Sequence, residues 1–163
     1  MKFGLRLTSL AAIVAFGMAW AALSASPLSP GVQPANQATT KLEMRLAEKE
    51  PAVGLAEAAV SGSAEKIYLH ADAIVTNADV VQARVVPGNS GSVFHVAIAF
   101  SRDGAAKMAQ ATASHVNKPL AILINGRVIT APILRGQISD NAVISGDFTN
   151  SEAQAIASGL NSR

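Results

Sequence analysis

Apolar and polar positions alternate with a period of two in several short segments, which is the pattern of strands with one buried face. Residues 41–48 place Leu42, Met44 and Leu46 on one face, so we predict a strand there, although the same residue types also favour a helix. The segment 92–100 alternates in the same way, with both of its phenylalanines on the face expected to be buried. Further strands are expected at 66–70, 84–87, 119–124, 127–134 and 142–148, with a loop at 51–63.

Two hairpins link these segments. Asn125-Gly126 is the strongest turn signal in the chain, because both central residues of a type I′ turn need a positive φ angle, which Asn and Gly adopt readily. Pro132 lies near the end of the returning segment and cannot donate to a strand ladder, which indicates a sheet edge or a strand end. A second hairpin is predicted around residues 87–91.

Helical spacing and capping residues predict two longer helices. Ser101 can cap a helix over residues 102–116, whose apolar stripe consists mainly of small side chains. Thr149 and Glu152 form a capping box that begins a helix through about residue 158, and Gly159 is expected to stop it.

A shorter helix is predicted over residues 76–83, because Thr76 is followed by Asp79 at the spacing of a cap. Hairpin-linked strands with two or three helices indicate an α+β fold. We expect a mixed, mainly antiparallel sheet with the helices packed on one face, as in a ferredoxin-like sandwich.

The N-terminal residues 1–25 have the order of a secretory signal peptide: two basic residues, an apolar stretch at 7–23 and small residues suited to cleavage. The alternative is an uncleaved membrane anchor, although this stretch is near the lower length limit for crossing a bilayer. Residues 26–40 carry three prolines and no charge, which predicts a disordered linker before a folded domain at 41–163. Both alternatives place that domain in the periplasm or another extracytoplasmic compartment.

The charge of the chain argues against a nucleic-acid partner. The formal net charge is +2, but two of the basic residues, Lys2 and Arg6, lie in the N-terminal segment, and the remaining 11 basic and 11 acidic residues balance. A neutral domain without a run of Lys or Arg lacks the electrostatic footprint of nucleic-acid binding. The chain has no cysteine, which excludes disulfides, thiolate chemistry, cysteine zinc sites and lipid modification of an N-terminal cysteine.

No catalytic or metal-binding constellation stands out in the sequence. The loop around Ser90 resembles the nucleophile loop of chymotrypsin-like proteases, and His70 and Asp79 precede it in the protease order, but a Gly-Asn-Ser hairpin loop explains the same residues. The histidines at positions 70, 95 and 115 have no close ligand spacing. We therefore predict no metal, no cofactor and no enzyme activity, with a serine hydrolase around Ser90 as a remote alternative.

Three ordered stretches resemble the head of the first periplasmic domain of SecD and of fused SecDF export proteins. They are FSRDGAAK at 100–107, KPLAILINGRVITAP at 118–132, and ISGDFT at 144–149 followed by Glu152-Ala153. The resemblance covers about 60 residues well, and residues 41–99 fit more loosely as the preceding strands and short helix. The matched residues to which we assign structural roles are Gly104, Asn125, Gly126, Pro132, Gly146, Phe148, Thr149 and Glu152.

The resemblance implies an exported, non-catalytic binding module. It would contact unfolded or extended exported polypeptides, or translocation components of the envelope, and an edge strand can take up an extended peptide by backbone pairing. The residues expected to make these contacts are Val128, Ile129, Ile133, Arg135, Gln137, Asp140 and Asn141. The alternatives are that this edge is covered, or that the chain is a structural or assembly protein that pairs through the same sheet, as a homodimer or an accessory subunit.

Overall fold

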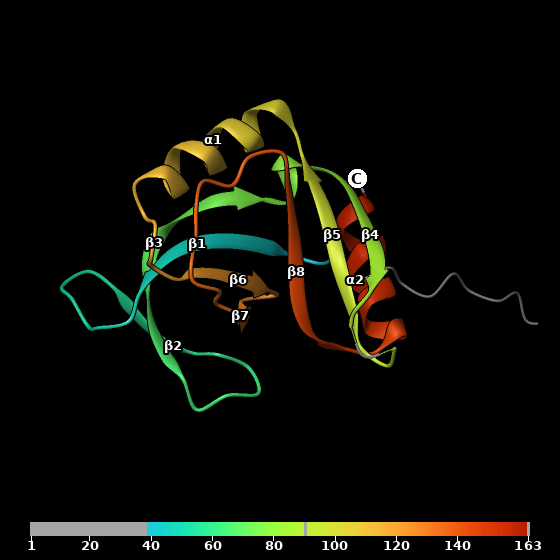
Figure 1. Ribbon diagram of the computed structural model, residues 1–163, viewed down its shortest axis with the longest axis horizontal. Helices are drawn as coiled ribbons and strands as arrows, with labels where there is room; N and C mark the ends of the chain where they lie inside the picture. The colour runs from blue at the N-terminus through green and yellow to red at the C-terminus, as the bar shows by residue number, and fades with distance from the viewer. Residues whose placement is uncertain (1–38, 90, 163) are drawn as a thin grey trace, which may run out of the picture. The chain divides into compact units, whose positions relative to one another are not determined.

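A computed structural model of the chain describes residues 39–89 and 91–162, which fold into two sheets and two α-helices (Figure 1). The predicted signal peptide and nearly all of the predicted linker lie outside these residues. The strands are β1 (Leu42–Glu48), β2 (Ala56–Ala59), β3 (Lys66–Thr76), β4 (Val80–Pro87), β5 (Phe94–Phe100), β6 (Leu120–Ile124), β7 (Arg127–Thr130) and β8 (Asn141–Phe148). The helices are α1 (Arg102–Ala113), α2 (Asn150–Asn161) and a single 3₁₀ turn, η1 (Asn77–Asp79).

Every strand pairing is antiparallel, which confirms the predicted α+β class. A larger sheet has the order β2-β3-β1-β6-β7 and a smaller sheet the order β4-β5-β8, so the strands are divided between two sheets. Helix α1 contacts β3 and β5, and α2 packs against β4 and β5. Figure 1 shows α1 beside β3 of the larger sheet and α2 beside the smaller sheet.

The main hydrophobic core lies between the two sheets and the helices. The larger sheet contributes Leu42, Met44 and Val75, the smaller sheet Val96, Ile98 and Ile144, and the helices Met108, Ala153, Ala157 and Leu160. A second cluster is formed by Ala47, Val60, Ile67, Leu69, Ala121, Leu123 and Val128. The larger sheet is thus covered on both faces, which explains why every residue of β6 is buried and apolar.

The helix predicted over residues 76–83 is wrong beyond its first turn. Asp79 does accept from the Thr76 N–H, as the capping pattern predicted, but only η1 follows, and the chain continues as β4. Val80 is fully buried and pairs with Phe100 in the smaller sheet. Pairing with β5 therefore outweighs the local helical signal.

The prediction of a continuous loop at 51–63 is also wrong, because it contains β2. The sequence of β2, Ala-Glu-Ala-Ala, has no intrinsic preference for a strand, and its conformation comes from pairing with β3 over residues 66–69. Strand β3 itself is longer than predicted and runs to Thr76.

Gly159 does not stop the last helix, which continues to Asn161. The glycine instead allows close packing: a Cβ at this position would lie 2.8 Å from the Thr40 Cβ and 2.9 Å from the Thr40 nitrogen. At the other end of α2 the Thr149–Glu152 capping box is present. Gly159 is therefore explained by a tertiary contact with Thr40, just before β1, and it does not mark the end of a helix.

The Asn125-Gly126 turn has positive φ angles of 52° and 79°. Asn125 also holds the start of β1, because its side-chain oxygen accepts from the Lys41 N–H at 2.8 Å and its own N–H donates to the Lys41 carbonyl at 2.8 Å. The turn thereby fixes both the β6–β7 register and the entry of the chain into the larger sheet.

Asp79 is a buried carboxylate, with a side chain 8% exposed, at the junction of η1 and α1. It lies 2.7 Å from the Lys107 ammonium and accepts from the Thr76 N–H at 3.0 Å. Burial acts to raise the pKa of Asp79, but the hydrogen bond from Lys107 and that from the Thr76 N–H outweigh it and hold the pKa below the ordinary value of 3.8.

Because this pKa is lower in the folded chain, the ionised form of Asp79 adds stability that is complete well above pH 3.8 and is lost as the pH falls through the folded pKa. We expect Asp79→Asn to be less stable than the wild type at pH 7 and the difference to shrink under acidic conditions. Urea unfolding from pH 7 to pH values below 3.8 measures this. A difference that stays constant across that range would show that the charge of Asp79 has no stabilising role.

Candidate functional site

Strands β2 and β7 form the two edges of the larger sheet, yet the sheet curls so that they approach each other. The Ser61 N–H, just after β2, donates to the Val128 carbonyl of β7 at 2.9 Å. Residues from both edges line a hollow of about 380 Å³, which we call the β2–β7 groove: Ala58, Ala59, Val60, Ser61, Gly126, Arg127 and Val128. Figure 1 shows β7 close to the hairpin that connects β2 and β3.

The backbone of β2 presents hydrogen-bonding groups to this groove. The Val60 N–H donates to the Glu65 carbonyl, and hydrogen-bonded pairs alternate along an antiparallel ladder. Ala58, opposite Ile67, therefore bonds to β3, whereas Ala59, opposite Lys66, directs its N–H and C=O toward the free edge. An extended chain in the groove can pair with these groups.

The groove combines small side chains with charged groups at its margin. Alanine, serine and glycine dominate the lining, so the backbone of a bound chain can approach without selecting bulky side chains. Arg127 is exposed in the lining, and an exposed ion pair of 2.7 Å joins Glu57 to Lys66 on the adjoining hairpin. Such a surface suits backbone recognition with little dependence on sequence.

Of the residues expected to contact a polypeptide, those on the β7 side are largely occupied within the fold. Val128 is 3% exposed, and its carbonyl is bonded to Ser61. Ile129 packs against the main core, and Ile133 is half-buried and forms a bridge with Pro119. Part of the β7 edge is therefore covered, as one of the alternatives above expected, and the accessible backbone edge lies on β2.

The loop between β7 and β8 and the first residue of β8 carry the other expected contact residues. Arg135, Gln137, Asp140 and Asn141 are all exposed. The loop is anchored from beneath, because the Ile138 N–H donates to the hydroxyl of the buried Thr112 in α1 at 2.9 Å, and the Asp140 carbonyl accepts from the Phe100 N–H at 2.9 Å. The structure does not bring this loop into the lining of the β2–β7 groove.

Three of the residues assigned structural roles, Gly104, Gly146 and Phe148, lie at close contacts. A Cβ at Gly104 would lie 2.7 Å from the Asp79 Cβ, and one at Gly146 would lie 2.8 Å from the Phe148 ring. The Pro132 carbonyl accepts from the Leu120 N–H at 2.9 Å, which continues the pairing of the two segments beyond β7.

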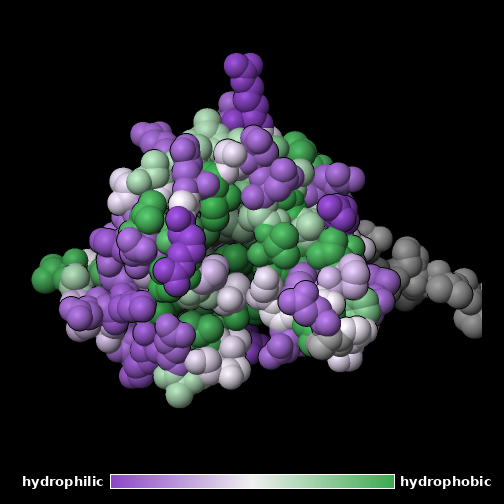
Figure 2. Space-filling model, viewed as in Figure 1, coloured by the Kyte–Doolittle hydropathy of each residue, from purple (hydrophilic) through white to green (hydrophobic). Residues whose placement is uncertain are grey.

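The outer face of the smaller sheet carries an exposed valine beside small and charged side chains. Val143 on β8 is 52% exposed and lies opposite Ala97, which in turn lies opposite Arg84, so these three residues share the outer face. Figure 2 shows hydrophobic surface gathered over β8 and β5.

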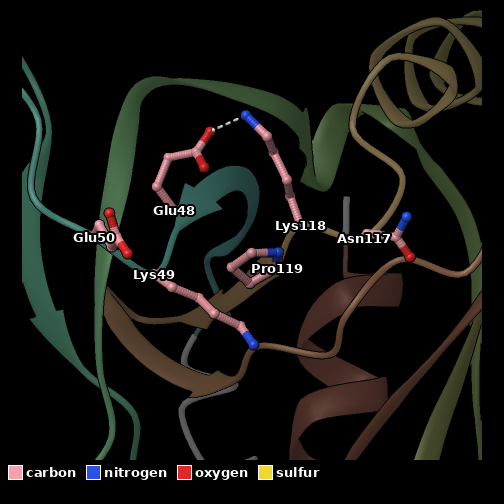
Figure 3. A pocket seen from close by; sticks show the side chains of 6 residues that line it. All are labelled: Glu48, Lys49, Glu50, Asn117, Lys118 and Pro119. Atoms are coloured by element: carbon pink, nitrogen blue, oxygen red, sulfur yellow. Dashed lines mark hydrogen bonds and ion pairs between the residues drawn. The ribbon is translucent and has the colours of Figure 1, made fainter.

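A second hollow, of about 210 Å³, lies at the end of β1 and is lined by Glu48, Lys49, Glu50, Asn117, Lys118 and Pro119. Figure 3 shows the Glu48 carboxylate directed at the Lys118 ammonium, 2.7 Å away. This hydrogen bond lowers the pKa of Glu48, although partial burial opposes the shift.

The fold also gathers histidines that are far apart in the sequence. His70 and His115 lie beside Glu48, with their ring centroids 6.0 Å apart and their planes nearly perpendicular. Sequence spacing offers no signal for this cluster, because its members come from β1, from β3 and from the segment after α1. A protease triad would require a hydrogen bond between Asp79 and His70, but the Asp79 carboxylate instead accepts from Lys107 and from the Thr76 N–H. Ser90 lies outside the described residues.

Within residues 39–89 and 91–162, no helix has the length and apolar character needed to cross a bilayer.

Comparisons with known proteins agree on one family. The sequence model described as "SecDF, P1 head subdomain" matches residues 53–162. Similar proteins include protein translocase subunit SecD of Elusimicrobium minutum, 36% identical over 55% of this chain and 19% of its own length, and protein translocase subunit SecDF of Thermus thermophilus, 39% identical over 52% of this chain and 11% of its own length. The chain thus spans about a fifth or less of these two relatives.

Solved structures show the same likeness. One is described as a membrane component SecDF that enhances protein export; it superposes with a TM-score of 0.63 at 25% identity, covering 82% of this chain and 71% of that chain. Another, SecDF in a super-membrane-facing form, superposes with a TM-score of 0.62 at 29% identity, covering 76% of this chain and 19% of that chain.

Proposed function

Because this chain belongs to the SecDF P1 head family, we propose that it is an extracytoplasmic, non-catalytic module of protein export that binds extended polypeptide segments in the β2–β7 groove. The observation that supports this most is the convergence of two sheet edges around a hollow lined by small residues. The exposed residues Arg135, Gln137 and Asp140 of the β7–β8 loop, with Asn141 at the start of β8, would be a further contact for the same polypeptide or for the translocation machinery.

Binding would occur by backbone pairing. An extended chain beside β2 accepts from the Ala59 N–H and donates to the Ala59 carbonyl, and the small side chains of the groove leave room for different sequences. Such binding tolerates many passenger sequences, which suits a module that meets polypeptides in transit. It also needs no nucleophile, acid or metal.

The Ala59→Pro substitution tests this mechanism. Proline removes the outward N–H donor while the β3 hydrogen bonds of the neighbouring Ala58 and Val60 stay available, so peptide binding should be lost with little change in stability. Fluorescence anisotropy with a labelled, unfolded segment of an exported protein measures the affinity, and urea unfolding measures the stability.

Ala59→Thr is the matched control, since it changes the same side chain but keeps the N–H and favours a strand. It should bind the labelled segment nearly as well as the wild type. Unchanged binding by a folded Ala59→Pro variant would contradict the proposed groove.

A second candidate function is assembly with another envelope protein or with a second copy of the chain. The exposed outer face of the smaller sheet, with Val143, favours it. Sedimentation at micromolar concentration separates the alternatives: a monomer that still binds peptide supports the first, and a Val143-dependent dimer supports the second.

A further inference from the structure

The cluster of Glu48, His70 and His115 has the composition of a transition-metal site. Each residue offers one ligand atom, and these atoms all lie within 4.8 Å of one another. Glu48 ends β1, His70 lies in β3, and His115 follows α1, so the cluster joins three segments of the fold. Two imidazoles and one carboxylate are the three protein ligands found at many zinc sites that keep a further position open.

The imidazole of His115 is oriented by the end of helix α1. Its Nδ1 lies 3.1 Å from the Ala111 carbonyl oxygen and 3.0 Å from the Ser114 hydroxyl. Because a carbonyl can only accept, Nδ1 carries the proton and donates, which leaves the lone pair on Nε2. A histidine that ligates a metal through one nitrogen while the other donates to a backbone carbonyl is the usual arrangement around such ions.

His70 supplies an independent observation. Its Nε2 atom is shielded from solvent and makes no hydrogen bond among the described residues, although it lies 3.5 Å from the Glu48 carboxylate. A buried polar atom without a hydrogen bond is unfavourable in a folded protein. Coordination of a cation at this atom would remove that cost.

The carboxylate of Glu48 is already engaged by a cation, the Lys118 ammonium at 2.7 Å. The side chain of Lys118 is 47% exposed, so it can move into water when another cation takes its place. Lys118 would therefore compete with a metal ion, and its removal would favour binding.

We propose that Glu48, His70 and His115 form a binding site for a divalent transition metal, with zinc as the expected ion, and that Lys118 occupies the carboxylate in the metal-free protein. The ion would tie the end of α1 to strands β1 and β3 at the end of the larger sheet. The preference for zinc follows from the two imidazole ligands, since sites for magnesium or calcium are built from oxygen ligands. This inference is independent of the β2–β7 groove.

The test is titration of the purified, metal-free chain with Co²⁺, whose visible absorption reports its ligands, followed by displacement with Zn²⁺. The chain has no cysteine, so a signal cannot come from thiolates. We expect one ion per chain. His70→Ala and His115→Ala should each weaken binding by at least about tenfold, because even the loss of a partner behind a ligand costs about 10- to 100-fold.

Two further variants keep the test decisive. His95→Ala removes the remaining histidine, which lies in β5 of the smaller sheet, and should leave the affinity unchanged. Lys118→Met should tighten binding, a result that loss of structure cannot produce. The absence of binding at micromolar metal, or equal weakening by all three histidine variants, would overturn the proposal.

Discussion

Met108→Ala should lower the free energy of unfolding by about 2–5 kcal/mol, the range for truncating a large buried side chain to alanine. Met108 is 0% exposed in α1, and it belongs to the core that both sheets share. Truncation removes apolar contact and leaves a cavity that the surrounding strands can only partly fill. Equilibrium urea unfolding, followed by far-UV circular dichroism, measures the loss.

Met108→Leu is the matched control, because it nearly conserves volume and should cost less than about 1.5 kcal/mol. If Met108→Ala lowered the free energy of unfolding no more than Met108→Leu, the packing of α1 against the core would contribute little to stability. The helix would then be only loosely attached to the sheets, against the packing described above.

Gly104→Ala should also destabilise the domain, by about 1–3 kcal/mol, although alanine is the better helix former. The added Cβ would lie 2.7 Å from the Asp79 Cβ and 2.8 Å from the Asp79 carbonyl oxygen. That carbonyl cannot easily retreat, because it accepts from the Ser101 N–H at 2.7 Å. The first turn of α1 would have to move away from η1.

The control for this substitution is Gly136→Ala. A Cβ at Gly136 has no neighbour within 4 Å, and its backbone lacks a positive φ angle, so this change should be nearly neutral. Thermal unfolding of both variants beside the wild type gives the comparison. Equal stability of the two variants would show that the close approach of α1 to Asp79 is not required.

The parts of the fold that the sequence predicted are those with strong local signals. Thr149 and Glu152 form the expected capping box, Ser101 caps α1, and Asn125-Gly126 adopts the expected turn. Each of these depends on hydrogen bonds or backbone angles within a few residues. Local chemistry was sufficient at these positions.

The parts that were missed depend on contacts between distant segments. Strand β2 follows from pairing with β3, the short η1 from the burial of Val80, and the continuation of α2 through Gly159 from contact with Thr40. The division of the strands into two sheets is a further effect of this kind. The local sequence alone predicted a loop in place of β2, a longer helix in place of η1 and a helix end at Gly159.

The same distinction applies to the candidate site. The sequence indicated an edge strand near Val128, but the curl of the larger sheet covers part of that edge with Ser61 and exposes the backbone of Ala59 instead. The Glu48, His70 and His115 cluster could not be predicted from spacing, because its members meet only when β1, β3 and the end of α1 come together.

Amide chemical-shift mapping of the ¹⁵N-labelled chain with an unfolded segment of an exported protein addresses the binding surface directly. We expect the largest shifts at Ala59 and its neighbours along β2, smaller ones at Gly126 and Arg127, and none in α2. Saturation of the peptide with shifts confined to the outer face of the smaller sheet, or with no shifts at all, would contradict a polypeptide-binding groove between β2 and β7.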